Sequence, residues 1–111
     1  MVKYSTLDAA LSALADPTRR QIVERLVQGE ATLSELAAPH EMSMPAIMKH
    51  VGKLADAGLV NRNKRGRVVT CSLNPEPLNE TSRWLNENLT FWNGRLDALG
   101  EFIDRRREDN E

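Results

Sequence analysis

The residues best suited to chemistry in this 111-residue sequence are cations gathered in one stretch. Residues 43–70 hold six basic residues and one acid, a formal charge of 6 − 1 = +5; the basic residues are Lys49, Lys53, Arg62, Lys64, Arg65 and Arg67. Residues 71–104 hold two basic and six acidic residues, a charge of 2 − 6 = −4. Because lysine and arginine neutralise phosphates, this asymmetry favours a nucleic-acid surface over the alternative of two solvated faces.

Two of these cations lie on a helix predicted at residues 43–57. Ser43 is suited to cap its first turn, and Pro45 fits within that turn, where a missing N–H costs little. Gly58 ends the helix as a residue that tolerates a left-handed backbone. The apolar residues that recur on one helical face are Ile47, Val51, Leu54 and Ala55.

A shorter helix is predicted just before it, at residues 32–38. Thr32 and Glu35 have the spacing of a capping box, and Leu33 and Leu36 supply the apolar face. Two such helices, separated by irregular residues 39–42, have the layout of a helix-turn-helix. The second helix is then the recognition helix.

A β-hairpin is predicted directly after this pair, at residues 59–73. Valine and threonine are enriched on either side of Gly66, and the expected tip, Asn63–Arg67, is polar and cationic. A hairpin at this position is a wing, and its charge favours contact with phosphate or the minor groove. The alternative is a surface hairpin with solubilising charges.

Further helices are predicted on both sides of this region. A short first helix carries an apolar stripe formed by Leu7, Ala10, Leu11 and Leu14. A second helix begins at Asp16-Pro17, where a capping residue precedes proline, and ends at Gly29. Its inward-facing residues are expected to be Ile22, Val23, Leu26 and Val27.

A long final helix is predicted after Asn74-Pro75. Its apolar residues are spaced 7, 4, 3, 4, 3 and 4 apart, as in an a/d seam; they are Leu78, Leu85, Leu89, Trp92, Leu96, Leu99 and Ile103. This face, with its aromatic flanks, exceeds what one side of a small monomer needs. Intramolecular core is one explanation, and a dimer interface is the favoured one.

Composition and cysteine usage narrow the class of protein. With 41% hydrophobic and 28% charged residues the chain suits one soluble domain, and residues 1–4 lack the apolar segment of a signal peptide, so we expect a cytoplasmic protein with no membrane span. Cys71 is the only cysteine, which precludes an intrachain disulfide, and we expect a buried structural thiol. Two histidines, one cysteine and no acidic dyad argue against an enzyme.

In combination, these segments resemble the ArsR-type winged-helix repressors. The matching stretches run from about Leu11 to Pro75 and are LADPTRRQIVERL, SELA, MSMPAIMKHVGKLADAGLV and KRGRVVTCSLNP. The tail, with its Trp and Phe-Trp pattern, resembles a subgroup of that family. The resemblance implies a mostly α-helical winged helix of about five helices and a wing, repressing a bacterial promoter as a homodimer.

The resemblance also divides the chain by role. It implies one winged-helix domain, 1–111, with dimerisation helices at 1–15 and 75–106, the helix-turn-helix at 32–57 and the wing at 59–73. The residues expected in the dimer interface are Leu7, Leu11, Leu85, Leu89, Trp92, Leu96, Leu99 and Ile103.

For DNA contact, the resemblance places Met44, Pro45, Met48 and Lys49 toward the major groove. Lys49 can donate to guanine or phosphate, whereas the methionines offer apolar contact and leave more of the specificity to DNA shape. His50 either reaches a phosphate or braces the turn. The full expected set is Thr32, Ser34, Ser43, Met44, Pro45, Ala46, Met48, Lys49, His50, Lys53, Lys64, Arg65 and Arg67.

The same comparison argues against metal. Metal-sensing members carry a Cys-x-Cys pattern in the third helix, where this sequence has Thr32 and Ser34, neither of them a soft ligand. Members with zinc between their final helices use histidine, and the only histidines here are His40 and His50. We therefore expect no metal or cofactor.

The expected partners are double-stranded DNA with a pseudo-palindromic operator, a second copy of the chain, and an unidentified small-molecule or protein effector. The rival hypothesis is a protein-interaction module that uses the aromatic face of the last helix, with the winged helix as its scaffold.

Overall fold

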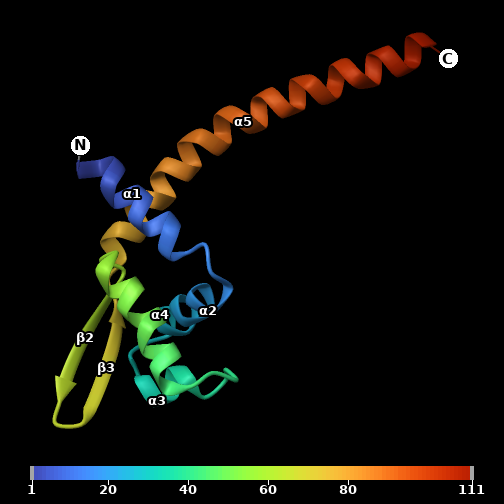
Figure 1. Ribbon diagram of the computed structural model, residues 1–111. Coiled ribbons are helices and arrows are strands. Elements are labelled where there is room, and N and C mark those ends of the chain that lie inside the picture. The colour runs from blue at the N-terminus through green and yellow to red at the C-terminus, as the bar shows by residue number, and fades with distance from the viewer. Residues whose placement is uncertain (1, 111) are drawn as a thin grey trace. The chain divides into compact units, whose positions relative to one another are not determined.

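The computed structural model describes the backbone of residues 2–110 and the side chains of residues 6–90, 94, 98 and 100–108. These residues form five helices and one three-stranded sheet (Figure 1). The helices are α1 Val2–Ala13, α2 Pro17–Val27, α3 Leu33–Ala37, α4 Met44–Asp56 and α5 Pro75–Asn110. The chain divides into two compact units, Met1–Thr81 and Ser82–Glu111. The first unit is a winged helix, as the sequence predicts.

Side-chain caps fix where α2, α3 and α4 begin, because the first N–H groups of a helix lack partners within it. The Asp16 carboxylate accepts from the backbone N–H of Arg19 at 3.0 Å. Thr32 and Glu35 form the reciprocal capping box, with bonds of 3.2 and 3.1 Å. The Ser43 hydroxyl accepts from the N–H of Ala46 at 3.3 Å. All three predicted helix starts are confirmed.

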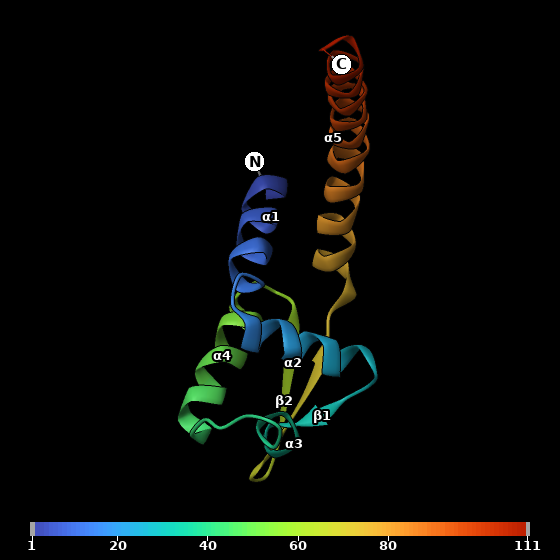
Figure 2. The same ribbon diagram turned by 90° about the vertical axis from the view of Figure 1, so that its right-hand side faces the viewer.

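The sheet contains one strand more than the sequence predicts. Its strands are β1 Ala31–Thr32, β2 Val60–Arg65 and β3 Val68–Leu73, all antiparallel in the order β1-β3-β2. Figure 2 shows β1 beside the hairpin. A two-residue strand has no periodicity of its own, and β1 exists because Ala31 and Thr32 pair with Cys71 and Thr70. It anchors the start of α3 to the wing.

The wing turn is tighter than the predicted tip, Asn63–Arg67. Only Gly66 and Arg67 form the turn, with Gly66 at a φ of +64°, a conformation that glycine adopts without strain. Asn63, Lys64 and Arg65 are strand residues that continue the pairing with β3 up to the turn. Strand alternation, rather than a loose loop, therefore decides where these side chains point.

A closed apolar core unites the elements of the first unit. Its largest fully buried side chains come from α2, α3, α4 and the sheet region, namely Ile22, Leu36, Ile47, Val51, Leu54, Leu59 and Cys71. The predicted buried thiol at Cys71 is thus confirmed. The prediction for Val27 is wrong: this side chain is 68% exposed, because it lies at the end of α2 beyond the turn that contacts the core.

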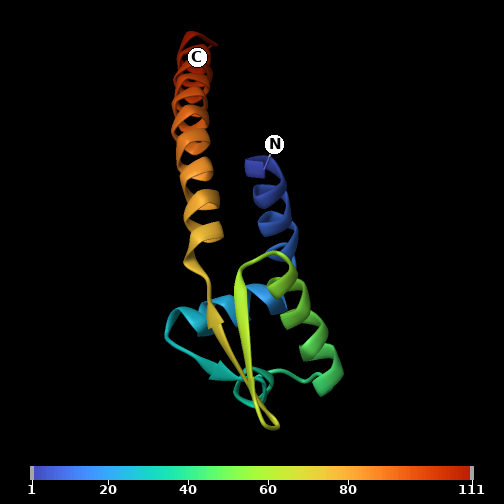
Figure 3. The ribbon, with the colours of Figure 1, turned by 90° about the vertical axis from the view of Figure 1, so that its left-hand side faces the viewer.

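The wing turn, α3 and the N-terminal end of α4 lie at the same end of the first unit (Figures 1 and 3). At its other end, Gly58 adopts a φ of +78° after α4, and Asn74 donates from Nδ2 to the Gly58 carbonyl at 2.9 Å. This bond ties the end of α4 to the start of α5. No described helix combines the length and the apolar character that a membrane span requires.

Candidate nucleic-acid interface

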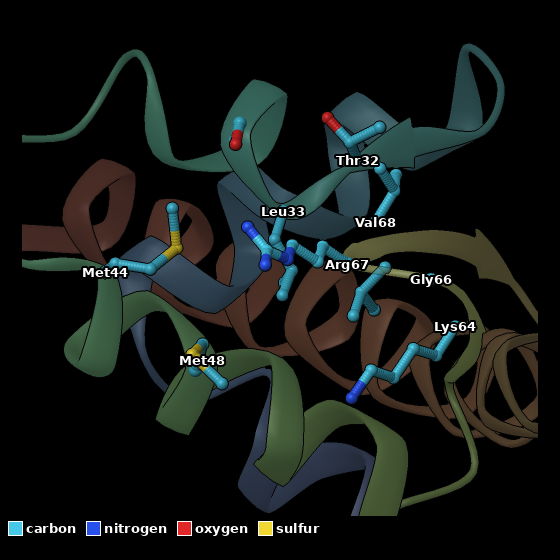
Figure 4. A pocket seen from close by; sticks show the side chains of 10 residues that line it. Thr32, Leu33, Met44, Met48, Lys64, Gly66, Arg67 and Val68 are labelled. Atoms are coloured by element: carbon cyan, nitrogen blue, oxygen red, sulfur yellow. The ribbon is translucent and has the colours of Figure 1, made fainter.

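A hollow of about 570 Å³ opens where α3, α4 and the wing meet. We call it the wing groove; Figure 4 shows the side chains that line it. They are Thr32, Leu33 and Ser34 from the start of α3, Met44 and Met48 from α4, and Lys64, Gly66, Arg67, Val68 and Val69 from the wing. Hydroxyl, cationic and apolar groups therefore share one concave surface.

The strand register separates two neighbouring cations of the wing. Lys64 pairs with Val69, and both line the wing groove. Arg65 pairs with Val68 at the next position, so its side chain starts from the opposite face of the hairpin. In Figure 4 the Lys64 side chain extends from the wing toward α4. Of these three wing cations, Lys64 and Arg67 line the wing groove and Arg65 does not.

Arg62 is a further cation on the side of the hairpin that faces α4, although it does not line the wing groove and is absent from the expected set of contacts. It lies two residues before Lys64 and pairs with Cys71, so it shares that face of the hairpin. A Cβ at Gly52 would lie 3.9 Å from Nη1 of Arg62, which shows that the guanidinium reaches α4 where that helix has no side chain. The alternation of Arg62 and Lys64 in β2 is the sequence signal that identifies it.

The exposed face of α4 carries the residues expected to approach bases. Met44 and Met48 are exposed one turn apart, while Pro45 and Lys49 are exposed beside them. Ala46 is partly buried, and Ser43 is exposed and used as the cap. The core residues of α4 lie on another face of the helix. All of these groups except Ala46 are therefore exposed and can contact a ligand.

His50 contacts the corner between α1 and α2. Its Nδ1 lies 3.3 Å from Nη1 of Arg19 and 3.8 Å from Oδ2 of Asp16. Arg19 also donates from Nε and Nη2 to the carbonyls of Ala13 and Ser12 at the end of α1. These contacts of His50 link α4 to the preceding helices rather than to the turn between α3 and α4, so both roles expected for His50 stay predictions.

The contacts at this corner lower the pKa of the Asp16 carboxylate. The Arg19 backbone N–H, and more weakly the charges of His50 and Arg19, lower the pKa of Asp16 below its ordinary 3.8. The charged form of Asp16 is therefore the one that the cap of α2 stabilises.

Lys53 lies apart from the wing groove. It lines a smaller hollow of about 220 Å³ with Ala9, Ser12 and Ala13 of α1, together with Arg19 and Asp56. Among the expected DNA contacts, Lys53 and His50 are thus the two that the structure associates with α1 and α2.

The residues expected at a dimer interface differ in burial. The single chain already buries Leu7, whereas Leu11, Leu85, Leu89 and Ile103 keep at least a third of their surface exposed. Trp92, Leu96 and Leu99 lie outside the residues whose side chains are described. Trp84 and Phe102, which flank the seam, are exposed as well. An apolar face is therefore present on α5 among the described positions.

The groups with metal-binding chemistry are dispersed. Among the described residues, no three or more His, Cys, Asp or Glu side chains are grouped as a metal site requires. Burial raises the pKa of the Cys71 thiol, which keeps it in the protonated form. His40 is partly exposed in the turn between α3 and α4.

Sequence reasoning also missed the apolar part of the wing groove, formed by Leu33, Val68 and Val69. The sequence predicts Leu33 on an apolar helix face and the valines in a hairpin; Leu33 and Val69 pack against the core and line the groove as well. Val69 reaches the groove because the pairing of β2 with β3 brings it opposite Lys64.

Several known proteins are similar to this chain in sequence and in fold. Residues 14–63 match the family described as a helix-turn-helix domain. A helix-turn-helix-type transcriptional regulator of Mycobacterium tuberculosis is 36% identical over 109 residues, covering 98% of this chain and 99% of the regulator. A transcriptional repressor of Bacillus subtilis is 29% identical over 79 residues, covering 71% of this chain and 88% of the repressor.

A crystal structure of an ArsR family transcriptional regulator matches with a TM-score of 0.74 and 44% identity, covering 79% of this chain and 91% of that chain. The chain therefore belongs to the ArsR family of winged helix-turn-helix proteins, which are DNA-binding transcriptional regulators.

Proposed function

We propose that the chain is a homodimeric repressor that binds a pseudo-palindromic operator without the family's usual metal sites. The observation that carries the proposal is the wing groove, where two cations and two hydroxyl residues meet the exposed face of α4. Cations and hydroxyls are the groups that hold phosphates, and an exposed helix beside them is suited to the major groove.

The contacts divide by chemistry. Lys64 and Arg67, with the hydroxyls of Thr32 and Ser34, bind one stretch of backbone phosphates. The exposed face of α4, from Ser43 to Lys49, approaches base edges. Arg65, which does not line the wing groove, binds only the neighbouring backbone and contributes less than Lys64.

A second copy of the chain completes the operator-binding unit. Leu11 on α1 and the exposed leucines of α5 supply apolar surface that a partner would cover. A two-fold dimer presents two copies of α4, so we expect half-sites about 10 base pairs apart or a multiple of that.

Metal independence is supported by residue chemistry. Thr32 and Ser34 occupy the positions where the resemblance expects thiolates, and their hydroxyls are hard, neutral groups that bind soft metals poorly. An organic or protein effector would then relieve repression.

The test is a salt titration of binding to the DNA upstream of the protein's own gene. Lys64→Ala should weaken binding to all sequences and flatten the dependence of log K on log salt by about one unit, the weight of one phosphate contact. Arg65→Ala removes the same charge from a residue that does not line the groove and should flatten the slope less. An unchanged slope for Lys64→Ala would exclude the wing groove from the interface.

Adding zinc or EDTA to the same titration tests metal independence. Binding that is indifferent to both supports the proposal, whereas abolition by zinc contradicts it. If no DNA is bound even at low salt, the result favours the rival hypothesis that the aromatic face of α5 binds another protein. That rival predicts that charge reversal on α5, rather than on the wing, removes the activity.

A further inference from the structure

The wing groove is more apolar than phosphate binding requires. Five of its ten lining residues are apolar: Leu33, Met44, Met48, Val68 and Val69. Val68 and Met48 are about half exposed, at 52% and 50%, and Met44 is 38% exposed. These side chains meet water in the free protein, and a phosphate offers them no favourable contact.

The two methionines do not belong to the core. The fully buried residues of α4 are Ile47, Val51 and Leu54, whereas Met44 and Met48 form a separate stripe one turn apart that faces the wing. Figure 4 shows both methionines on the α4 side of the groove, with Leu33 and Val68 on its other side. Together they form an apolar surface with adaptable side chains, since methionine is unbranched and polarisable.

The recognition helix also lacks most of the side chains that usually read bases by paired hydrogen bonds. α4 contains no arginine, asparagine or glutamine, which with lysine are the residues that bind guanine or adenine in bidentate fashion. Of its polar side chains, His50 is engaged with Asp16 and Arg19, and Lys53 lies beside α1. Lys49 is the remaining donor on the exposed face, so most of that face is apolar.

We propose that Met44 and Met48, with Leu33 and Val68, read the C5-methyl group of thymine in the major groove. This inference rests on the proposed DNA-binding function and names what the interface recognises. The thymine methyl is the apolar group that base edges present in the major groove. The two cations and the hydroxyls at the rim of the wing groove hold the phosphates of the strand that carries it.

The test uses a duplex that the wild-type protein selects from a randomised DNA pool. Each thymine is replaced singly by deoxyuridine, which removes the methyl and keeps the base pair. At one or more thymines of each half-site, the wild-type affinity should fall about fourfold, the value for one buried methyl group. Replacement of the other thymines should leave the affinity unchanged.

Variants assign the effect to residues. Met48→Ala and Met44→Ala should bind the thymine and uracil duplexes with nearly equal affinity, whereas Met48→Leu should keep the preference. Met42→Ala is the matched control: Met42 is exposed in the turn before α4 but does not line the wing groove, so its loss should leave the preference intact.

Three outcomes would overturn the inference. If every uracil duplex binds the wild type as tightly as the thymine duplex, while binding remains salt-sensitive and sequence-selective, methyl readout is wrong and the proposed function stands. If the uracil effect persists in the Met44→Ala, Met48→Ala double variant, other residues read the methyl. Absence of any salt-sensitive DNA binding would overturn the proposed function together with the inference.

Discussion

The two compact units of the chain differ in the burial of the apolar stripes on their helices. In the unit Met1–Thr81, the apolar face of α4 is closed: Ile47, Val51 and Leu54 have at most 1% of their surface exposed. In the unit Ser82–Glu111, the regularly spaced Leu85, Leu89 and Ile103 are 37–51% exposed. Both helices carry an apolar stripe of helical period; the stripe of α4 is buried, whereas the described residues Leu85, Leu89 and Ile103 of the α5 stripe are exposed.

The difference shows that one pattern serves two purposes. The stripe of α4 is matched by residues of α2, α3 and the sheet, so the winged helix supplies its own core. The stripe of α5 has a repeat close to 3.5 residues, which keeps a straight seam along a long helix and suits a second helix of the same kind. Mutations on the stripe of α4 should therefore lower the free energy of unfolding, whereas mutations on the stripe of α5 should weaken the proposed dimer.

The largest effect is expected in the core of the winged helix. Leu54→Ala removes a fully buried side chain and should lower the free energy of unfolding by about 2–5 kcal/mol, the loss of transfer free energy plus a cavity. Urea unfolding followed by circular dichroism measures it. Met48→Ala, on the exposed face of the same helix, is the control and should cost far less. An equally small loss at Leu54 would mean that the core can collapse onto the site.

A smaller effect of a different kind is expected on α5. Leu89 is 51% exposed in the single chain, and Leu89→Glu places a charge in the seam proposed to bind a second copy. Dimer affinity should fall by about 2–4 kcal/mol, as at an interface hot spot. Analytical ultracentrifugation over a range of concentrations measures the change.

The control for that variant is Thr90→Glu, which adds the same charge at an exposed position one residue away and off the seam. It should leave the dimer intact. A stable dimer in Leu89→Glu would contradict the assignment of the seam as the interface, and the two stripes would then differ only in exposure.

Much of this organisation is predictable from sequence because its signals are local. The capping residues Asp16, Thr32 and Ser43 each act within three residues of the helix they begin, and all three bonds are present. The helix-turn-helix and the hairpin follow from apolar periods of 3.6 and 2 in short windows. The spacing of apolar residues in α5 indicates the dimer seam in the same way, and the seam stays a prediction.

The features that escape sequence reasoning depend on partners distant along the chain. β1 exists only through its pairing with β3, about 40 residues later. Arg19 meets His50 across 31 positions, and no local pattern relates them. The opposite placement of Lys64 and Arg65 needs the turn to be two residues long, which the cationic composition of the tip conceals. In each case the missing information is register or packing rather than propensity.

Arg19 allows a test of how polar contacts support the closed unit. Arg19→Ala removes donors to the carbonyls of Ser12 and Ala13 and the contact with His50, leaving the end of α1 without its partners. The free energy of unfolding should fall by about 1–2 kcal/mol. Arg20→Ala is the matched control, because Arg20 makes one exposed bond, to the Leu14 carbonyl. Equal losses would show that the partly buried corner adds nothing beyond a surface bond.

The smallest effect is expected from acid at the cap of α3, in the closed unit. The Thr32 backbone N–H, followed by its hydroxyl and Arg25, lowers the pKa of Glu35 below its ordinary 4.5. A carboxylate with a depressed pKa in the folded state stabilises that state above pH 4.5 and loses this contribution as the pH falls through the folded value. Glu35→Gln should therefore be less stable than the wild type in urea at pH 7, and the two should converge as the pH falls through the lowered pKa of Glu35. Glu41→Gln removes the same charge from an exposed turn and should change stability at neither pH. A gap that persists in acid would mean that Glu35 acts through packing, and that the caps of the winged helix do not depend on charge.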